Sequence, residues 1–445
     1  MSFGPDALAQ RLAALEQGEP PDRYLVAYSG GLDSTALLHA LAAARAYHGR
    51  ALVAVHVNHG LHAAADDWER HCRRFARGIG AAFVSRRVAL DPHAARKRGV
   101  EAAARSARYA ALRAAMVAGD VLLSAHHLED QAETVLLNLM RGSGLAGIAA
   151  IAAARALPPG RLFRPLLDVP RAELAAYARR HRLEWLDDPS NLDTGFDRNY
   201  LRHEILPRLR QRWPAAAAQL KRSAELAAEA AALQDELGAI DYAAAAEGDA
   251  RLGIAALRAL PAARQRNVLR YALRTLGLPV PPQTRLRQVL EELVPARPDA
   301  RPLVRWPGAE VRRYRGRIYL LGERPLPACA PLAFDERGEV HLGAGQGFLF
   351  LEAEAADGLA PQLAAQGLEV RFRQGGEKIR PVGTRTTRPL KKLLQEEGIV
   401  PWMRDRLPLV YAGGRLVAVA DLWLAADAVA SPGCRVVWQD RPALF

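Results

Sequence analysis

The sequence predicts an α/β protein in three parts: an N-terminal parallel sheet covered by helices, a mainly helical middle part and a small mixed α+β C-terminal part. Short apolar runs alternate with helical stretches between residues 23 and 140, at a spacing typical of parallel sheets. Alanine-rich helical sequence follows, and mixed strand-like and helical pieces close the chain. The 445 residues suffice for two or three domains. We expect them at 1–211, 212–325 and 340–445.

In the N-terminal part, each apolar run is predicted to be a strand and each stretch after it a helix. The predicted strands are 24–28, 51–57, 81–88 and 120–126, and the predicted helices are 35–44, 63–78, 100–118 and 129–140. Parallel sheets bind ligands beyond the carboxyl ends of their strands, which directs attention to Ser29, 56–59 and 126–130. Four apolar positions of the last helix are expected to face the core: Val135, Leu136, Leu139 and Met140.

The middle part opens with PAAAAQLKRSAELAAEAAALQDEL, a strong helix by propensity. Helical sequence continues to TRLRQVLEEL and ends in short strand-like runs such as GRIYLLGE. The proline-rich ERPLPACAPLAF, residues 323–334, is interpreted as a linker. The C-terminal part mixes strand-like and helical pieces and contains no internal repeat.

Composition excludes several classes of protein. The N-terminus has no basic leader followed by an apolar core, and the apolar stretch 142–154 is too short to cross a bilayer. Cys72, Cys329 and Cys434 lie far apart with no CxxC, which argues against a disulfide framework and a cysteine-built metal centre. We expect a cytoplasmic protein that does not associate with membranes.

The net charge of +13 favours a nucleic-acid partner. Only five of the 61 basic residues are lysines, however, and alanine is abundant. Such a bias also arises from a GC-rich coding sequence, so the overall charge leaves both interpretations open.

The hexapeptide SGGLDS, residues 29–34, follows the first predicted strand and opens a helix. This arrangement points backbone N–H groups and a helix N-terminus at an anion, and the two glycines permit close approach. A Walker A loop would carry a lysine that reaches the β- and γ-phosphates, and its absence disfavours γ-phosphoryl transfer. The carboxylate of Asp33 suits Mg²⁺ held against a pyrophosphate. The alternative, a plain turn followed by a helix cap, accounts less well for six residues of this pattern after a buried strand.

SGGLDS resembles the PP-loop of the ATP pyrophosphatase superfamily, whose fold is that of the adenine nucleotide alpha hydrolases. Members cleave ATP between the α- and β-phosphates, transfer AMP to a substrate oxygen and let a nucleophile displace it. The resemblance implies that the protein binds ATP and Mg²⁺. Asp33 is expected to contact the metal ion that is bound to the pyrophosphate. The residues it implies for ATP binding are Ser29, Gly30, Gly31, Leu32, Asp33, Ser34, His56 and Val57.

Further stretches resemble the tRNA(Ile)-lysidine synthetase family. They are VHVNHGLH (55–62), ARSARYAAL (104–112), SAHHLEDQAETVLLNLMRGSGLAG (124–147), DDPSNLDTGFDRNYLRHEILP (187–207) and FRQGGEKIRPVGTRTTRPLKKLLQEEGIVPWMRDRLPLV (372–410). Ala125 stands where glycine is expected before the histidine pair, which is a mild departure.

The resemblance implies an ATP-dependent carbon–nitrogen ligase that acts on isoleucine tRNA with a CAU anticodon. The C2 carbonyl oxygen of the wobble cytidine is adenylated, the ε-amine of free L-lysine attacks C2, and AMP departs. The oxygen of an unmodified C2 carbonyl is a poor leaving group, whereas AMP is a good one. This difference explains why the reaction uses ATP. The product, lysidine, changes codon reading and amino-acid identity from methionine to isoleucine.

Such a reaction needs carboxylates for the amino acid and a base for its proton. Asp130 and Glu133 lie three residues apart and share a helix face, so we expect them to orient lysine or its catalytic partners. His127 is expected near the reacting phosphate, and Arg105 is expected to stabilise charge on the α-phosphate. Arg141 is a weaker candidate for that task.

Each of these residues also has a simpler interpretation. Acidic side chains are common in a first helical turn, Arg105 is one of many arginines, and the two histidines can be buried against backbone carbonyls. His56, His59 and His62 suggest zinc, but no acidic or cysteine ligand completes the set nearby.

Positive charge gathers between residues 371 and 406, where ten basic residues face four acidic ones. Three of the five lysines fall there, so codon bias explains this cluster poorly. It resembles a surface that contacts tRNA phosphates through Arg385, Arg388, Lys391 and Lys392. A solvated basic face without a ligand is the alternative.

Rival functions remain. A tRNA thiolase relies on cysteines that are scarce here, and GMP or NAD synthetase needs no basic C-terminal domain. An RNA-binding protein with an inactive ATP site is disfavoured by the intact loop residues. Whether the protein is a homodimer stays open.

Overall fold

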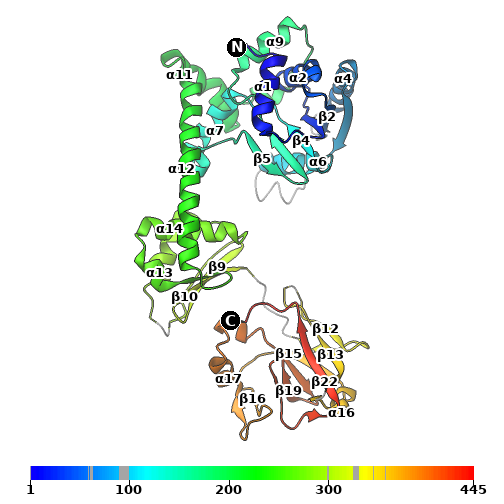
Figure 1. Ribbon diagram of the computed structural model, residues 1–445, viewed down its shortest axis with the longest axis vertical. Coiled ribbons are helices and arrows are strands. Elements are labelled where there is room, and N and C mark those ends of the chain that lie inside the picture. The colour runs from blue at the N-terminus through cyan, green and yellow to red at the C-terminus, as the bar shows by residue number, and fades with distance from the viewer. Residues whose placement is uncertain are drawn as a thin grey trace. The chain divides into compact units, whose positions relative to one another are not determined.

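The computed structural model describes residues 2–58, 60, 64–89, 100–297, 300–323, 330–343, 345–355 and 357–444. The chain forms two compact units, Met1–Gln234 and Asp235–Phe445. Figure 1 colours the chain from its N-terminus to its C-terminus and labels the elements of each unit. In the part of the chain that is described, no helix is long and apolar enough to span a membrane.

The first unit is built on a six-stranded sheet in the order β3-β2-β1-β4-β6-β5. The pairs that join β3, β2, β1, β4 and β6 are parallel, and β5 pairs antiparallel with β6. The strands are β1 (Arg23–Ala27), β2 (Ala51–Asn58), β3 (Ala82–Arg87), β4 (Asp120–Leu123), β5 (Ala154–Leu157) and β6 (Gly160–Phe163). The four predicted strands are therefore confirmed, and the β5–β6 hairpin is an addition to the prediction.

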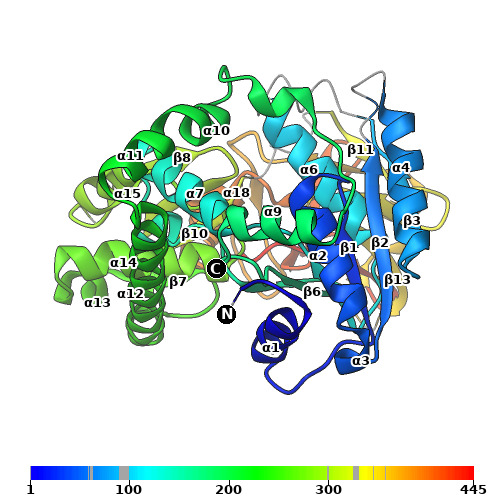
Figure 2. The same cartoon turned by 90° about the horizontal axis from the view of Figure 1, so that it is seen from above.

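Helices cover both faces of this sheet, and β1 shows why. Tyr24 and Val26 enter one apolar core, whereas Leu25 enters the other, because successive side chains of a strand point to opposite faces. Figure 2 shows α2 beside α9 over the first of these cores. The helices are α1 (Pro5–Glu16), α2 (Leu32–Ala43), α3 (Arg45–His48), α4 (Ala65–Gly78), α6 (Val100–Arg113), α7 (Leu128–Met140), α8 (Leu145–Ile148) and α9 (Arg171–Arg180).

One detail of the core prediction for α7 is wrong. Val135 is buried, but Leu139 and Met140 are exposed, Met140 by 78%. The apolar positions of the last turn therefore face solvent, so the spacing of apolar residues along α7 marks its core face only in the earlier turns.

A helical segment closes the first unit and continues into the second. It comprises η1 (Pro189–Leu192), α10 (Asp197–Tyr200), the π-helical turn η2 (Leu201–Ile205), α11 (Leu206–Arg212) and α12 (Ala216–Ala245). The 30-residue α12 confirms the helix predicted from the alanine-rich run.

After the end of α12, the second unit continues with short helices packed against a four-stranded sheet in the order β7-β10-β9-β8. Its helices are α13 (Ile254–Ala259), α14 (Ala262–Thr275), α15 (Gln283–Gln288) and the π-helical turn η3 (Val289–Leu293). Its strands are β7 (Arg251–Gly253), β8 (Leu303–Trp306), β9 (Ala309–Tyr314) and β10 (Arg317–Gly322). The mainly helical prediction thus needs this small sheet added.

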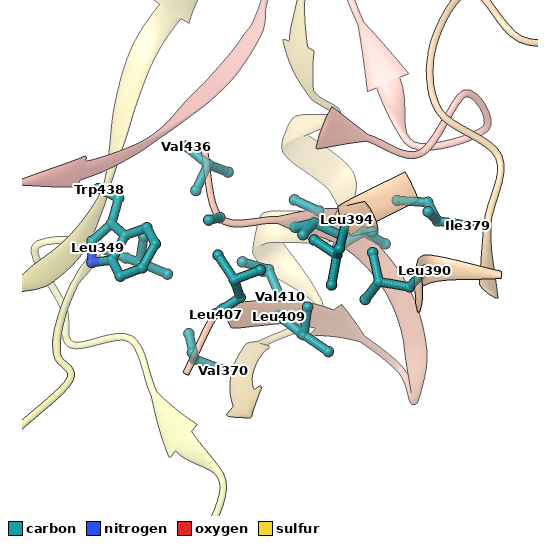
Figure 3. Packing of buried hydrophobic residues seen from close by; sticks show 14 of the residues in the cluster. Leu349, Val370, Ile379, Leu390, Leu394, Leu407, Leu409, Val410, Val436 and Trp438 are labelled. Atoms are coloured by element: carbon teal, nitrogen blue, oxygen red, sulfur yellow. The ribbon is translucent and has the colours of Figure 1, made fainter. Parts of the chain in front are cut away.

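The C-terminal part confirms the mixed α+β prediction. Two five-stranded sheets, β11-β15-β18-β19-β20 and β12-β13-β22-β14-β21, enclose one apolar core (Figure 3). The strands are β11 (Leu332–Ala333), β12 (Glu339–His341), β13 (Phe348–Ala355), β14 (Gly358–Leu359), β15 (Leu368–Phe372), β16 (Lys378–Ile379), β17 (Arg388–Pro389), β18 (Pro408–Ala412), β19 (Arg415–Val419), β20 (Trp423–Leu424), β21 (Val429–Ala430) and β22 (Gly433–Gln439). The helices are α16 (Pro361–Ala365), α17 (Leu390–Glu396) and α18 (Pro401–Arg404). Half of the predicted linker, residues 324–329, lies outside the described residues.

Candidate active site

The loop between β1 and α2 needs glycine for two reasons. Gly30 has φ of +86°, a left-handed conformation that favours glycine. A Cβ at this position would also lie 2.7 Å from Sγ of Cys72 and 2.9 Å from Cδ1 of Leu186. The Leu186 N–H donates to the Gly30 carbonyl at 2.9 Å. The loop is thus held between α4 and the segment that follows α9.

Hydroxyl groups stabilise the loop from inside. Oγ of Ser29 and Oγ of Ser34 lie 3.0 Å apart, and the Ser34 hydroxyl donates to the Gly31 carbonyl at 3.1 Å. The Thr35 hydroxyl donates to the Gly30 carbonyl at 3.2 Å. The first intrahelical bond of α2 is donated by the Thr35 N–H to Gly31, so the preceding N–H groups of the first turn lack intrahelical acceptors. They form a site suited to phosphate oxygens.

Asp33 lies in this first turn and faces two basic groups. Its Oδ2 lies 3.7 Å from Nε2 of His127, and its Oδ1 lies 3.3 Å from Nε of Arg171. Oδ1 is buried and accepts no hydrogen bond from any described residue. A buried carboxylate oxygen that accepts no hydrogen bond fits a hard cation, which prefers oxygen ligands.

His127 caps α7 and is almost fully buried. Its N–H donates to Oδ2 of Asp130 at 3.0 Å, and its Nδ1 lies 3.0 Å from Oε2 of Glu129. Burial lowers the pKa of His127, but the nearby carboxylates of Glu129, Asp130 and Asp33 raise it by more, so the net shift is upward. The pKa of Glu129 falls to about 2, because bonds from His127 and Arg171 outweigh its burial.

His126 has the opposite electrostatics. Burial lowers the pKa of His126 to about 3, and the positive charges of Arg164 and Arg198 act in the same direction. Its Nδ1 lies 2.8 Å from Oγ of Ser124. The imidazole is therefore neutral at neutral pH, whereas its neighbour His127 gains affinity for a proton.

Asp130 and Glu133 share one helix face, but arginines occupy that face. Glu133, which is 0% exposed, accepts bonds of 2.7 Å from Nε of Arg198 and of 2.7 Å from Nε of Arg202. Oδ1 of Asp130 accepts from the same two guanidinium groups at 3.0 and 3.1 Å. Two carboxylates and two arginines thus form one partly buried network, which we call the α7 ion network.

Sequence reasoning missed Arg198 and Arg202. They lie four residues apart on α10 and η2, within the stretch 187–207 that was singled out only as a resemblance. Their i, i+4 spacing is the signal that was available, because it places both on one helix face.

Other predicted residues lie outside this network. The guanidinium of Arg105 lies over the ring of Tyr109, with its carbon 5.6 Å from the ring centroid, and among the described residues it forms no ion pair with Asp33 of the loop. Arg141 is exposed and forms a long ion pair of 3.9 Å with Asp197. Nδ1 of His56 lies 3.0 Å from the Tyr28 carbonyl in a buried position, and burial lowers its pKa.

The zinc alternative falls partly on undescribed positions, because His59 and His62 lie outside the described residues. Among the residues that are described, no three histidine, cysteine or acidic side chains form a metal-binding group. Val57, also predicted at the nucleotide, is half-buried in β2.

The predicted tRNA-binding residues lie on and beside α17. Leu390, Leu393 and Leu394 are buried, so Lys391 and Lys392 face solvent. Both lysines and Arg385 are exposed and form no ion pair with a described carboxylate, whereas Arg388 pairs with Glu396 at 2.5 Å.

A parallel sheet with a Ser-Gly-Gly loop at the start of a helix defines a PP-loop protein of the ATP-binding class. The family model described as "PP-loop domain" matches residues 6–209. Models described as "TilS substrate binding domain" and "TilS substrate C-terminal domain" match residues 252–319 and 368–438.

Similarity to curated proteins extends over nearly the whole chain. The tRNA(Ile)-lysidine synthase of Alkalilimnicola ehrlichii is 44% identical over 443 residues, which is 99% of this chain and 98% of that protein. The tRNA(Ile)-lysidine synthase of Ralstonia nicotianae is 45% identical over 454 aligned positions, covering 97% and 96%. That of Coxiella burnetii is 40% identical, covering 94% and 92%. The chain belongs to the tRNA(Ile)-lysidine synthase family.

Proposed function

We propose that this protein ligates free L-lysine to C2 of the wobble cytidine in isoleucine tRNA with a CAU anticodon. The reaction uses an adenylated tRNA intermediate and releases pyrophosphate and AMP. The observation that carries this proposal is that Asp33 of the loop lies beside His127, whose backbone N–H donates to Asp130 at the start of α7. Family membership over the full length supports the same reaction.

The loop residues are assigned to ATP. N–H groups of the first turn of α2 would hold phosphate oxygens, and the hydroxyls of Ser29 and Ser34 would add donors. Asp33 would hold Mg²⁺ through its Oδ1, which accepts no hydrogen bond from the described residues and lies 3.3 Å from Nε of Arg171. That ion supplies positive charge against the pyrophosphate that leaves.

His127, Asp130 and Glu133 are assigned to the two transfer steps. His127, whose pKa is raised and whose Nε2 lies 3.7 Å from Oδ2 of Asp33, would donate a hydrogen bond to the reacting phosphate. Asp130 and Glu133 would orient lysine. An amine of the lysine would take the place of a nitrogen of Arg198 or Arg202 as the hydrogen-bond donor to these carboxylates. Arg105 is assigned to the stabilisation of negative charge on the α-phosphate of ATP. The lysine amine must be neutral to attack, although its ordinary pKa is about 10.4.

Labelled lysine tests the whole proposal. We expect ATP-dependent incorporation of label into isoleucine tRNA with a CAU anticodon, and AMP in equal amount. AMP without label would refute lysine as the nucleophile and leave the PP-loop chemistry standing. Neither AMP nor label would refute the proposed reaction and favour a tRNA-binding protein without turnover.

The exposed lysines of α17 are assigned to the tRNA backbone. Replacing Lys391 and Lys392 with glutamine should weaken tRNA binding about tenfold and lower the slope of log K against log salt by about two. Replacing Arg337, exposed in the turn before β12, and Arg435, exposed on β22, removes the same charge and should change the slope little. Equal slopes for both double variants would place the tRNA contact elsewhere.

A further inference from the structure

Three arginines gather at the edge of the first unit's sheet, around the ring of Tyr109. The guanidinium carbon of Arg155 lies 5.2 Å from the ring centroid, and that of Arg105 lies 5.6 Å from it. Arg164 is within reach of the Tyr109 hydroxyl, with which it shares a side-chain hydrogen bond. We call Arg105, Arg155 and Arg164 the arginine cluster.

Arg164 is the unusual member, because it is buried with no counterion among the described residues. It is 5% exposed, and one of its terminal nitrogens donates to the Ala152 carbonyl at 2.5 Å. Its Nε is buried and donates to no described residue. Among the described residues, no carboxylate lies within ion-pair distance of the cluster's three guanidinium groups. A buried guanidinium is costly unless an anion or full hydrogen bonding compensates it.

The pKa values of Arg164 and of the neighbouring Tyr109 agree with an excess of positive charge. Burial lowers the pKa of Arg164, and the charges of Arg155 and Arg105 add to that effect, against the bond with Tyr109. Burial of Tyr109 opposes ionisation, but its hydrogen bond with Arg164 and the charges of Arg164 and Arg105 lower its pKa overall. A bound anion would raise both pKa values and so oppose these shifts.

The cluster lies at the ligand-binding edge of the sheet. Arg164 directly follows β6, which pairs in parallel with β4, and β4 pairs in parallel with β1. The ends of these strands carry, in order, Arg164, the His126–His127 pair and the PP-loop. Two strand spacings correspond to roughly 10 Å, so the cluster flanks the reaction site on the side away from the loop.

We propose that Arg155 and Arg164 of the arginine cluster bind a backbone phosphate of the tRNA beside the nucleotide that reacts, next to Arg105, which is assigned to the α-phosphate of ATP. The proposal rests on the proposed function, because it assumes an RNA substrate. Guanidinium groups match phosphate oxygens in a planar fork. A phosphodiester held there positions the target base between the cluster and the PP-loop, where the adenylate forms.

The phosphates of ATP are the other source of the same chemistry, and binding measurements separate the two. We choose Arg155→Gln in the full-length protein, because Arg155 is exposed and its loss should leave the fold intact. Without ATP or lysine, we expect tRNA binding to weaken about tenfold and the salt slope to fall by about one. ATP binding measured without tRNA should not change.

Arg77→Gln is the matched control. Arg77 is exposed in the last turn of α4, and this helix runs back to the edge of the sheet where the parallel strands begin. Arg77→Gln therefore removes one positive charge far from the proposed phosphate site. It should leave the salt slope unchanged. Arg155→Lys, which keeps the charge but loses the fork, should recover part of the affinity.

A tRNA with one neutral methylphosphonate linkage locates the phosphate. Placed beside the wobble cytidine, the neutral linkage should weaken binding of the unaltered protein about tenfold and have little effect on Arg155→Gln. Additive losses at every linkage tested, or an Arg155→Gln protein that binds tRNA normally, would overturn the proposal. Loss of ATP binding alone would assign the cluster to the nucleotide instead. Failure of the unaltered protein to incorporate lysine would refute only the proposed reaction.

Discussion

Asp33→Ala is expected to lower AMP formation about 10³-fold or more while tRNA binding largely survives. The carboxylate is the charged group of the loop and the expected contact to Mg²⁺ and pyrophosphate, and losing a metal contact removes several kcal/mol of charge stabilisation. The measurement is tRNA-stimulated release of AMP from labelled ATP, together with tRNA binding by the same preparation.

A matched control separates this role from a helix-capping role. Asp6 lies in the first turn of α1 and is exposed, so Asp6→Ala removes the same favourable interaction with a helix dipole. Its AMP formation should be unchanged. Asp33→Asn keeps the shape and should be nearly as inactive as Asp33→Ala. Normal turnover in either Asp33 variant would contradict the assigned role.

Glu133→Ala is expected to lower the free energy of unfolding of the first unit by roughly 3 kcal/mol. The change leaves two partly buried guanidinium groups, those of Arg198 and Arg202, with only Asp130 to balance them. Urea unfolding measures the effect, and hydrogen exchange of α7 assigns the transition to this unit. Lysine incorporation should be lost as well, because the same carboxylate is assigned to the amine.

Glu225→Ala provides the comparison on α12. Glu225 is 57% exposed and pairs with Lys221, and such surface pairs contribute about 0–1 kcal/mol. Adding Arg202→Ala to Glu133→Ala should recover part of the lost stability, because one uncompensated charge is removed. If Glu133→Ala cost no more than Glu225→Ala, the α7 ion network would not stabilise the unit.

Local sequence was sufficient for the loop and for the sheet around it. Gly30 is required by its backbone conformation and by the close approach of Cys72, and its place after a buried strand is visible in the sequence. The alternation of strands and helices follows from side-chain periodicity, a property of neighbouring residues. These features were therefore predicted correctly.

The partners of the charged residues were beyond the reach of such reasoning. Arg198 and Glu133 are 65 positions apart, and Arg210 and Glu129, which pair at 2.7 Å, are 81 positions apart. Sequence spacing places Asp130 and Glu133 on one helix face but does not say what covers that face. The role of these carboxylates toward lysine stays a prediction.

The sequence alone thus specifies the class of fold and the phosphate loop. It also carries the motifs by which the chain resembles its family. Each of these depends on the pattern of residues that are close together in the sequence. Tertiary structure decides which charges neutralise one another and which do not. It pairs Asp130 and Glu133 with arginines, and it leaves Arg164 buried with no described carboxylate beside it. The physical reason is that the pKa of an ionisable group depends on burial and on charges a few ångströms away, and the chain brings those charges together from distant positions.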